Sequence, residues 1–338
     1  DEVKTNEMEN TENTETELKQ SQEQEAEETK ETNIYVYYLL VLTKYFPIQD
    51  FTIVVEEFKD PILFIIISPG NDIDNLCLYL MIEPSKIHIE NLNKCGPYKG
   101  TDMMFRVIEY AKEVRIPKLE LTDKSKKFIC KSAINLAYLN ILTTGQSWYN
   151  SKGFYSDEYN EERDNNLLVI NKPFNELVEV IIENLTNPLI DMSSIIINLK
   201  KFESIKPFIK PFIFDMKELN RNLRNNPEVI DDIKTEFRNL INNAIPADNN
   251  TTIQEVFQNI QIQFRTFPES GCTEKQEQLV RIIDIIITML KHNSRHEWNK
   301  DFLINYNYSK LEYNVPLSGG KKNKTKKNKK KKLIAFNI

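Results

Sequence analysis

Hydrophobic positions in the first half of the chain come in short runs. Residues 62–67 are a compact β-branched run closed by a Pro-Gly pair, residues 76–82 are a second run, and residues 86–92 alternate between apolar and polar side chains. Runs of this length predict buried strands, and strict alternation predicts a strand with one exposed face. Residues 34–42 are interpreted as the first strand together with the start of the first helix.

A helix is expected after the third of these strands. Apolar side chains recur there at positions 104, 107, 108 and 111, which share one helical face. Thr101 or Asp102 is the expected N-cap, and Pro117 ends the helix. The pattern further predicts a short strand at 118–122, a second helix at 132–151, and a closing hairpin made of 154–159 and 167–170.

Helical spacing dominates after residue 171. Apolar residues repeat at helical intervals within 178–185, 195–202, 230–245, 253–264 and 276–290, and prolines separate several of these segments. The predicted fold class is therefore α+β: a mixed, twisted sheet with flanking helices in residues 34–171, followed by an all-α helical domain in residues 172–316. The helical half contains no catalytic pattern.

Charge is concentrated at the two ends of the chain. Residues 1–33 hold twelve acids and three lysines, and residues 321–332 hold nine lysines. Because these contributions, −9 and +9, cancel, the body carries the whole net charge of −6. Residues 1–33 and 317–338 are therefore predicted to be disordered tails. The lysine run is expected to contact a polyanion weakly, and wholesale nucleic-acid binding by the mildly acidic body is not expected.

The four cysteines are Cys77, Cys95, Cys130 and Cys272, with no Cys-x-x-Cys pair. Their scatter argues against a structural zinc site and against the disulfide framework of a secreted protein, so a reducing intracellular compartment is expected. No apolar run is long enough to span a bilayer, and the acidic start lacks the basic region of a signal peptide. No transmembrane segment is predicted.

Glycine is scarce, with 8 in 338 residues, and four of these lie between residues 96 and 153. The glycines that such a chain keeps are expected where the backbone does not tolerate a Cβ. Gly96 and Gly100 lie between a predicted strand and a predicted helix, where free N–H groups and the helix dipole favour an anion. Lys94 and Lys99 add positive charge there. An ordinary strand-to-helix turn is the alternative interpretation.

The order strand, glycine-containing loop, helix, strand, helix, Gly-Phe over residues 86–159 resembles the cofactor-binding core of the Gcn5-related N-acetyltransferase (GNAT) family. In that family the loop after the fourth strand wraps the pyrophosphate of acetyl-coenzyme A, and the strand before it binds the pantetheine arm. The resemblance implies a cofactor site made of Leu92, Asn93, Gly96, Tyr98, Lys99, Gly100 and Thr101.

The same resemblance implies catalytic roles for two residues. Tyr149 stands four residues before Gly153-Phe154, where the family's tyrosine commonly protonates the departing coenzyme A thiolate. Glu90, on the strand before the loop, is the candidate general base, with His88 second. The alternatives are a core aromatic for Tyr149 and a solvated outward side chain for Glu90.

A pair of histidines and one cysteine are also candidates for reactive or metal-binding residues. His292 and His296 are four residues apart, but the glutamate of His-Glu-x-x-His is absent and the helix dipole accounts for the pair. No metal site is predicted. Cys95 lies beside the loop and is interpreted as an inert thiol.

Residues 141–151, and Ser318-Gly319-Gly320 before a lysine run, are similar to segments of uncharacterised proteins from giant DNA viruses. The predicted function is an N-acetyltransferase that moves acetyl from acetyl-coenzyme A to an unidentified amine, located in the host cytoplasm or a virion. The alternative is a catalytically inactive GNAT-like viral structural or host-interaction protein. Residues 95–100 favour the alternative, because they depart from the family's Gln/Arg-x-x-Gly-x-Gly/Ala pattern and Pro97 lacks an N–H.

Overall fold

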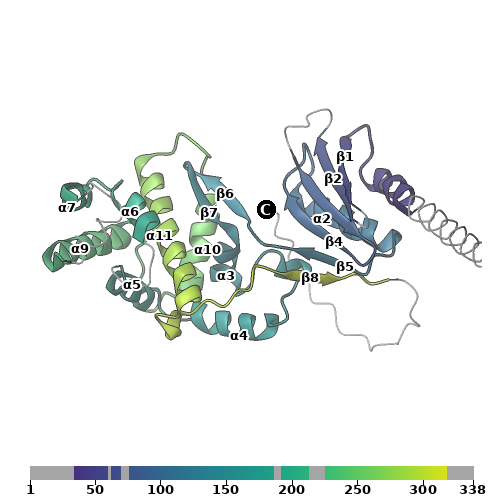
Figure 1. The fold of residues 1–338 in the computed structure, drawn as a ribbon. Helices are drawn as coiled ribbons and strands as arrows, with labels where there is room; N and C mark the ends of the chain where they lie inside the picture. The colour runs from purple at the N-terminus through teal and green to yellow at the C-terminus, as the bar shows by residue number, and fades with distance from the viewer. Residues whose placement is uncertain (1–33, 60–61, 70–75, 186–191, 213–224, 318–338) are drawn as a thin grey trace, which may run out of the picture. The chain divides into compact units, whose positions relative to one another are not determined.

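The computed structural model describes residues 34–59, 62–69, 76–185, 192–212 and 225–317 (Figure 1). Residue contacts divide the chain into two units: the described residues up to Leu119 and from Asn314 onward form the first, and Glu120–Tyr313 form the second. The second unit is therefore an insertion in the sequence of the first. The first boundary between the units lies between Leu119 and Glu120, whereas the apolar pattern predicted one after residue 171. Residues 120–171 therefore belong to the second unit.

The longest sheet has the strand order β1-β2-β3-β4-β5-β8, and its strands β1 to β4 lie wholly in the first unit. Its strands are β1 (Phe51–Lys59), β2 (Ile62–Pro69), β3 (Leu78–Glu83), β4 (Lys86–Leu92), β5 (Lys118–Leu121) and β8 (Leu311–Asn314). The pairs β1–β2, β2–β3 and β3–β4 are antiparallel. β4 and β5 are joined through the helix α2 (Gly100–Glu113), the crossover that parallel neighbours need. Because β8 falls within 172–316, the expectation of an all-α second half is wrong.

Four predicted strands are confirmed as β2 to β5. In β4 the apolar side chains Ile87 and Ile89 are buried and alternate with more exposed neighbours, as the pattern predicts. The pattern misses β1, because a bulge at Glu56 interrupts the alternation of that strand.

Residues 34–45 are helical, so the predicted first strand at 34–42 is wrong (Figure 1). Tyr35, Tyr38 and Leu42 are buried, and their spacing of three and four residues places them on one helical face. Three β-forming tyrosines in a short apolar run favoured a strand, but the burial follows the helical period.

The helix α2 buries the predicted apolar face, including Met104, Val107 and Ala111. Its N-cap is Lys99, two or three residues earlier than predicted, because the Asp102 carboxylate accepts a hydrogen bond from the Lys99 N–H at 3.0 Å. The helix ends at Glu113, before Pro117, as predicted.

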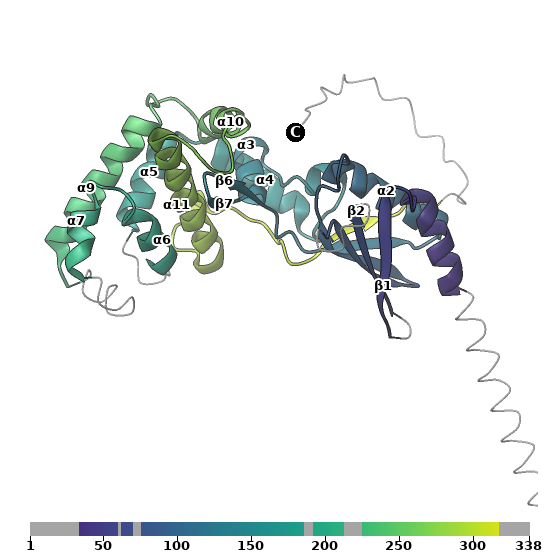
Figure 2. The ribbon, with the colours of Figure 1, turned by 90° about the horizontal axis from the view of Figure 1, so that it is seen from above.

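The second unit consists of a β-hairpin and a group of helices (Figures 1 and 2). Its longer elements are β6 (Lys126–Ile129), β7 (Ser132–Asn135), α3 (Leu136–Thr144), α4 (Tyr159–Ile170), α5 (Phe174–Glu183), α6 (Met192–Leu199), α9 (Pro227–Ala244), α10 (Ile253–Phe264) and α11 (Glu274–His296). The short helices are α7 (Lys206–Ile209), η1 (Asn150–Lys152), η2 (Lys210–Phe212) and η3 (Lys300–Phe302). The elements β7, α3, α6 and α9 all pack against α11, which lies at the centre of the apolar core.

Between residues 132 and 170 the local predictions are right only in part. The predicted helix at 132–151 is confirmed for α3 alone: β7 precedes it, and α3 ends where Gly145 adopts a left-handed φ of +79°. A Cβ at Gly145 would also lie 2.7 Å from the Leu167 side chain, so this glycine is required both by conformation and by space. The predicted hairpin at 154–170 is largely the helix α4, whose inward side chains include the polar residues Glu162 and Asn166.

All four cysteines pair, which corrects both the interpretation of Cys95 as an inert thiol and the argument from scatter against disulfides. Cys77–Cys95 lies in the first unit and Cys130–Cys272 in the second. Their partners are 18 and 142 residues apart, so chain spacing gave no sign of the pairs. Disulfides favour an oxidising setting over the predicted reducing one. No helix in the described residues is long and apolar enough to cross a bilayer.

Candidate ligand site at the start of α2

The strand β4 carries a bulge at Glu90. Tyr79 pairs with Asn91 and Leu80 with Ile89, so Glu90 has no cross-strand partner on β3. Its carboxylate lies 3.2 Å from His88 Nε2, which places the two predicted base candidates side by side. A bulge redirects the side chain that it inserts, and such irregularities are frequent next to active sites.

A tight turn follows β4. The N–H of Cys95 donates to the Tyr98 carbonyl and the N–H of Tyr98 donates to the Cys95 carbonyl, both at 2.9 Å. Gly96 takes the left-handed φ of +55° that this turn requires, so its expected conformational role is confirmed. The disulfide to Cys77, and the bond from the Asn93 N–H to the Cys77 carbonyl at 2.7 Å, tie the turn to the start of β3.

The first turn of α2 presents unused backbone donors. Within the described residues the N–H groups of Gly100 and Thr101 have no hydrogen-bond acceptor, whereas the Lys99 N–H is occupied by the Asp102 carboxylate. A Cβ at Gly100 would meet nothing within 4 Å. The expectation that Gly100 avoids a clash is therefore wrong, and the space beside it is open.

Tyr98 is occupied by contacts within the first unit. Its ring stacks on Phe51 at 5.1 Å between centroids, and its hydroxyl donates to Asp50 at 2.9 Å. The guanidinium carbon of Arg106 lies 4.5 Å from the centroid of the Tyr98 ring. The hydrogen bond to Asp50 raises the pKa of Tyr98. Tyr98 therefore anchors the turn to residues 45–51, and Arg106, which also donates to the Tyr45 carbonyl, is a cation that the sequence did not single out.

Of the predicted cofactor contacts, the structure gathers Leu92, Asn93 and the residues from Gly96 to Thr101 at the end of β4 and the start of α2. Leu92 is half-buried at the end of β4, and Asn93 is exposed, with its side-chain amide 3.4 Å from the Leu76 carbonyl. The cations that could attract an anion there are the side chains of Lys94 and Lys99, together with the α2 dipole.

Tyr149 belongs to the second unit. It is 9% exposed and lies against Trp148 and Phe154, and this burial raises the pKa of its hydroxyl. A phenol with a raised pKa holds its proton at neutral pH but is a weaker proton donor. The general-acid role stays a prediction from the sequence.

Two other places hold groups of polar side chains. The rings of His292 and His296 stack at 6.2 Å, and the described residues contain no group of three or more potential metal ligands. A hollow of about 450 Å³ at the start of α10 is lined by polar residues including Asp248, Thr251 and Glu255. Both carboxylates there already accept hydrogen bonds from Thr251 and Thr252, which lower their pKa values.

Compared with known proteins, the chain matches no protein-family model, no curated protein and no solved structure.

Proposed function

We propose that the first unit binds acetyl-coenzyme A at the start of α2 and acts as a GNAT-like N-acetyltransferase. The observation that carries the proposal is the sequence of features from β4 to β5: a bulged strand, a tight glycine turn, a helix whose first N–H groups are unused, and a return strand beside the first. The resemblance of residues 86–159 to the family supports the same assignment.

The chemistry would proceed by direct attack of a neutral amine on the thioester carbonyl: a C–N bond forms, the C–S bond breaks, and coenzyme A leaves as a thiolate that takes up a proton to become the thiol. A pyrophosphate would accept hydrogen bonds from the N–H groups of Gly100 and Thr101 and would be attracted by Lys99. The bulge leaves Glu90 without a partner on β3, and its carboxylate, 3.2 Å from His88 Nε2, would remove the ammonium proton of the amine. In this proposal Glu90 is the catalytic base, and the amine is not identified.

Coenzyme A binding tests the cofactor site. The full chain is expected to bind acetyl-coenzyme A in a titration calorimeter with little change between low and high salt. Gly100→Trp should abolish binding, because the indole would fill the open space beside the first N–H groups of α2. Gly100→Ala is the control for helix stability and should bind almost as well. Equal binding by Gly100→Trp, or no binding by the unmodified chain at millimolar ligand, would contradict the site.

Acetyl transfer tests the base separately. Glu90→Gln is expected to lower turnover by at least about 100-fold while leaving cofactor affinity unchanged, since general-base catalysis contributes about 10²–10⁴-fold. The matched control is Glu56→Gln, because Glu56 is the exposed, unpaired residue of the corresponding bulge in β1. Equal turnover of the two variants would remove Glu90 from the mechanism.

A catalytically inactive interaction protein is the second candidate, and one observation favours it. The Asp102 carboxylate sits at the α2 N-terminus and already neutralises part of the field that a pyrophosphate needs. Under this alternative, Asp102→Asn leaves coenzyme A binding undetectable. Under the proposed function the same substitution removes a repulsion and tightens binding severalfold.

A further inference from the structure

The hairpin β6–β7 in the second unit displays an unusual concentration of positive charge. Residues 124–131 read Lys-Ser-Lys-Lys-Phe-Ile-Cys-Lys, with four lysines and no acid, and all four lysines are exposed. The middle of this run holds Phe128, a large apolar side chain that is 60% exposed. At this exposure Phe128 contributes little to the core and leaves an aromatic face open to a ligand.

The register of β6 and β7 gives the hairpin one exposed face and one buried face. Phe128 pairs with Ala133 and Lys126 with Asn135, so Lys126 and Phe128 point to one face. Ile129 and Ile134 point to the opposite face and are fully buried. We call the face with Lys126 and Phe128, together with the exposed Lys124 and Lys131 at either end of the run, the hairpin surface.

The lysines of the hairpin surface have no acidic partner in the part of the chain that the structure describes. None of Lys124, Lys126 and Lys131 forms an ion pair with a carboxylate there. Asp284, the acid that lies near Lys126, instead accepts a hydrogen bond from the Asn198 side chain at 2.7 Å. These three lysines therefore remain available to an external anion.

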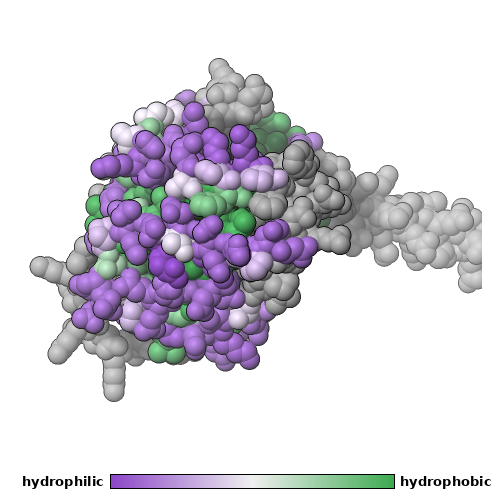
Figure 3. Space-filling view, turned by 90° about the vertical axis from the view of Figure 1, so that its left-hand side faces the viewer, coloured by the Kyte–Doolittle hydropathy of each residue, from purple (hydrophilic) through white to green (hydrophobic). Residues whose placement is uncertain are grey.

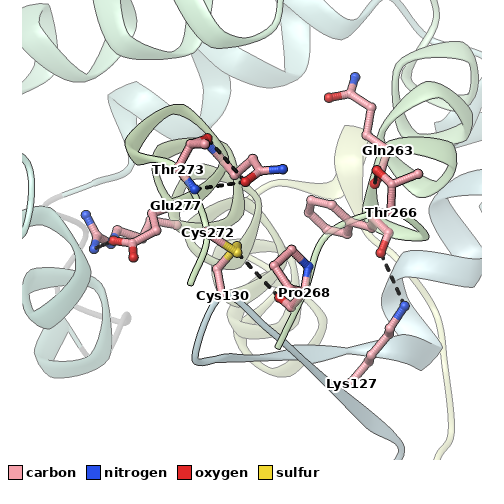
Figure 4. Close-up of a disulfide and its surroundings, with 11 residues drawn as sticks. Lys127, Cys130, Gln263, Thr266, Pro268, Cys272, Thr273 and Glu277 are labelled. Atoms are coloured by element: carbon pink, nitrogen blue, oxygen red, sulfur yellow. Dashed lines mark hydrogen bonds and ion pairs between the residues drawn. A yellow bond between two sulfur atoms is a disulfide. The ribbon is translucent and has the colours of Figure 1, made fainter. Parts of the chain in front are cut away.

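The tip of the hairpin is held in a conformation that its residues disfavour. Cys130 and Lys131 have φ values of 49° and 64°, a left-handed pair usually given to Asn-Gly in two-residue hairpin turns. The disulfide to Cys272 holds it (Figure 4), as do the bonds from the Cys130 and Lys131 N–H groups to the carbonyls of Pro268 and Glu269. Lys127 adds a bond of 3.2 Å to the Phe264 carbonyl. Strained backbone persists where the surroundings fix it, and it concentrates at functional places.

We propose that the hairpin surface binds single-stranded nucleic acid. Its lysines contact phosphates, and Phe128 stacks on an unpaired base. An aromatic ring on a cationic surface favours this partner, because a base offers a flat face on which the ring can stack. The positive charge is confined to the hairpin surface, so it is compatible with the net negative charge of the body as a whole.

The test measures anisotropy of a labelled 20-nucleotide single strand against the full chain. The nine tail lysines are replaced by glutamine in every protein, so that the tail does not mask the body. Phe128→Ala should weaken binding about five- to a hundredfold. Phe105→Ala is the matched control, since Phe105 is 56% exposed on α2, and it should change nothing. A polyphosphate of similar charge, which has no bases, should bind Phe128→Ala as well as the unmodified surface.

Salt dependence tests the charged part. Replacing Lys126 and Lys131 by glutamine should lower the slope of log affinity against log salt by about 1.4, or 0.7 for each lost phosphate contact. Lys206→Gln with Lys210→Gln, on α7 and η2, should leave the slope unchanged. The proposal is overturned if Phe128→Ala behaves like Phe105→Ala, if both lysine pairs change the slope equally, or if a duplex binds as tightly as the single strand.

Discussion

Replacing Cys130 and Cys272 together by serine is expected to lower the free energy of unfolding of the second unit by about 5 kcal/mol, the value for a closed loop of well over a hundred residues in the chain-entropy model. The partners are 142 residues apart, so the cross-link removes a large part of the freedom of the unfolded chain. Loss of the bond also releases the hairpin tip, where two non-glycine residues hold left-handed conformations. The lost stability should be visible as a lower urea midpoint.

Tryptophan fluorescence isolates this effect, because both tryptophans, Trp148 and Trp298, lie in the second unit. Cys77→Ser with Cys95→Ser is the comparison variant. That pair closes a loop only 18 residues apart in sequence and is expected to cost the first unit about 3 kcal/mol, with little change in the tryptophan signal. A shift below about 1 kcal/mol for the Cys130 and Cys272 variant, or four titratable thiols in the unfolded unmodified chain, would contradict the pairing.

The pattern of apolar positions predicts a helix or strand correctly when the buried side chains repeat at the spacing of that element, two residues for a strand or 3.6 for a helix. It predicts β2, β3, β4 and α2, because each buries a regular apolar face, and it also finds β5, where Glu120 is buried together with Leu119 and Leu121. It also predicts α5, α6, α9, α10 and α11. It fails for α4, where Glu162 and Asn166 occupy inward positions beside Val169 and Ile170. Those polar side chains are buried because they bind backbone groups, a tertiary cause that hydropathy does not record.

Disulfide pairing lies outside what a single sequence tells. Cys130 and Cys272 meet because the β6–β7 turn lies beside the loop that precedes α11, and that arrangement depends on the packing of the whole second unit. The scatter of the four cysteines along the chain therefore gave no sign of the two pairs.

The face of the second unit seen in Figure 3 is mostly hydrophilic, with apolar residues between the polar ones.

The candidate site was predicted in part. The scarcity of glycine correctly predicted that the backbone at Gly96 requires a glycine, because the turn has a left-handed φ there. It did not explain Gly100, whose surroundings are open. The bulge at Glu90 and the contacts of Arg106 with Tyr98 depend on strand register and on a helix face packed against a loop, neither of which local composition encodes.

The segment that returns the chain from α11 to β8 is fixed mainly by side chains. Asn166 on α4 accepts from the Asn305 N–H at 2.9 Å and donates to the Asn305 carbonyl at 2.8 Å, and Glu162 accepts from the Asn307 N–H at 2.7 Å. Tyr306 donates to the buried Asp123 at 2.5 Å. A buried backbone without strand or helix partners needs such acceptors and donors, which explains why inward positions of α4 are polar.

Asn293, near the end of α11, carries the largest share of these bonds. Its side chain is fully buried, donates to the carbonyls of Asn299 at 2.7 Å and Phe302 at 3.0 Å, and accepts from the Asn299 N–H at 2.9 Å. Asn293→Ala should lower the free energy of unfolding of the second unit by about 3 kcal/mol, because three backbone groups lose a partner and each buried unsatisfied group costs about 1–3 kcal/mol.

The control for Asn293→Ala is Asn171→Ala. Asn171 also donates from its side chain to a carbonyl, that of Leu167 at 2.7 Å, but it is exposed, so water replaces the lost partner. Its substitution should cost less than about 0.5 kcal/mol, the usual range for surface changes. Urea unfolding followed by tryptophan fluorescence compares the two directly. Equal losses would show that burial does not set the cost and that the Asn293 bonds are not what fixes the returning segment.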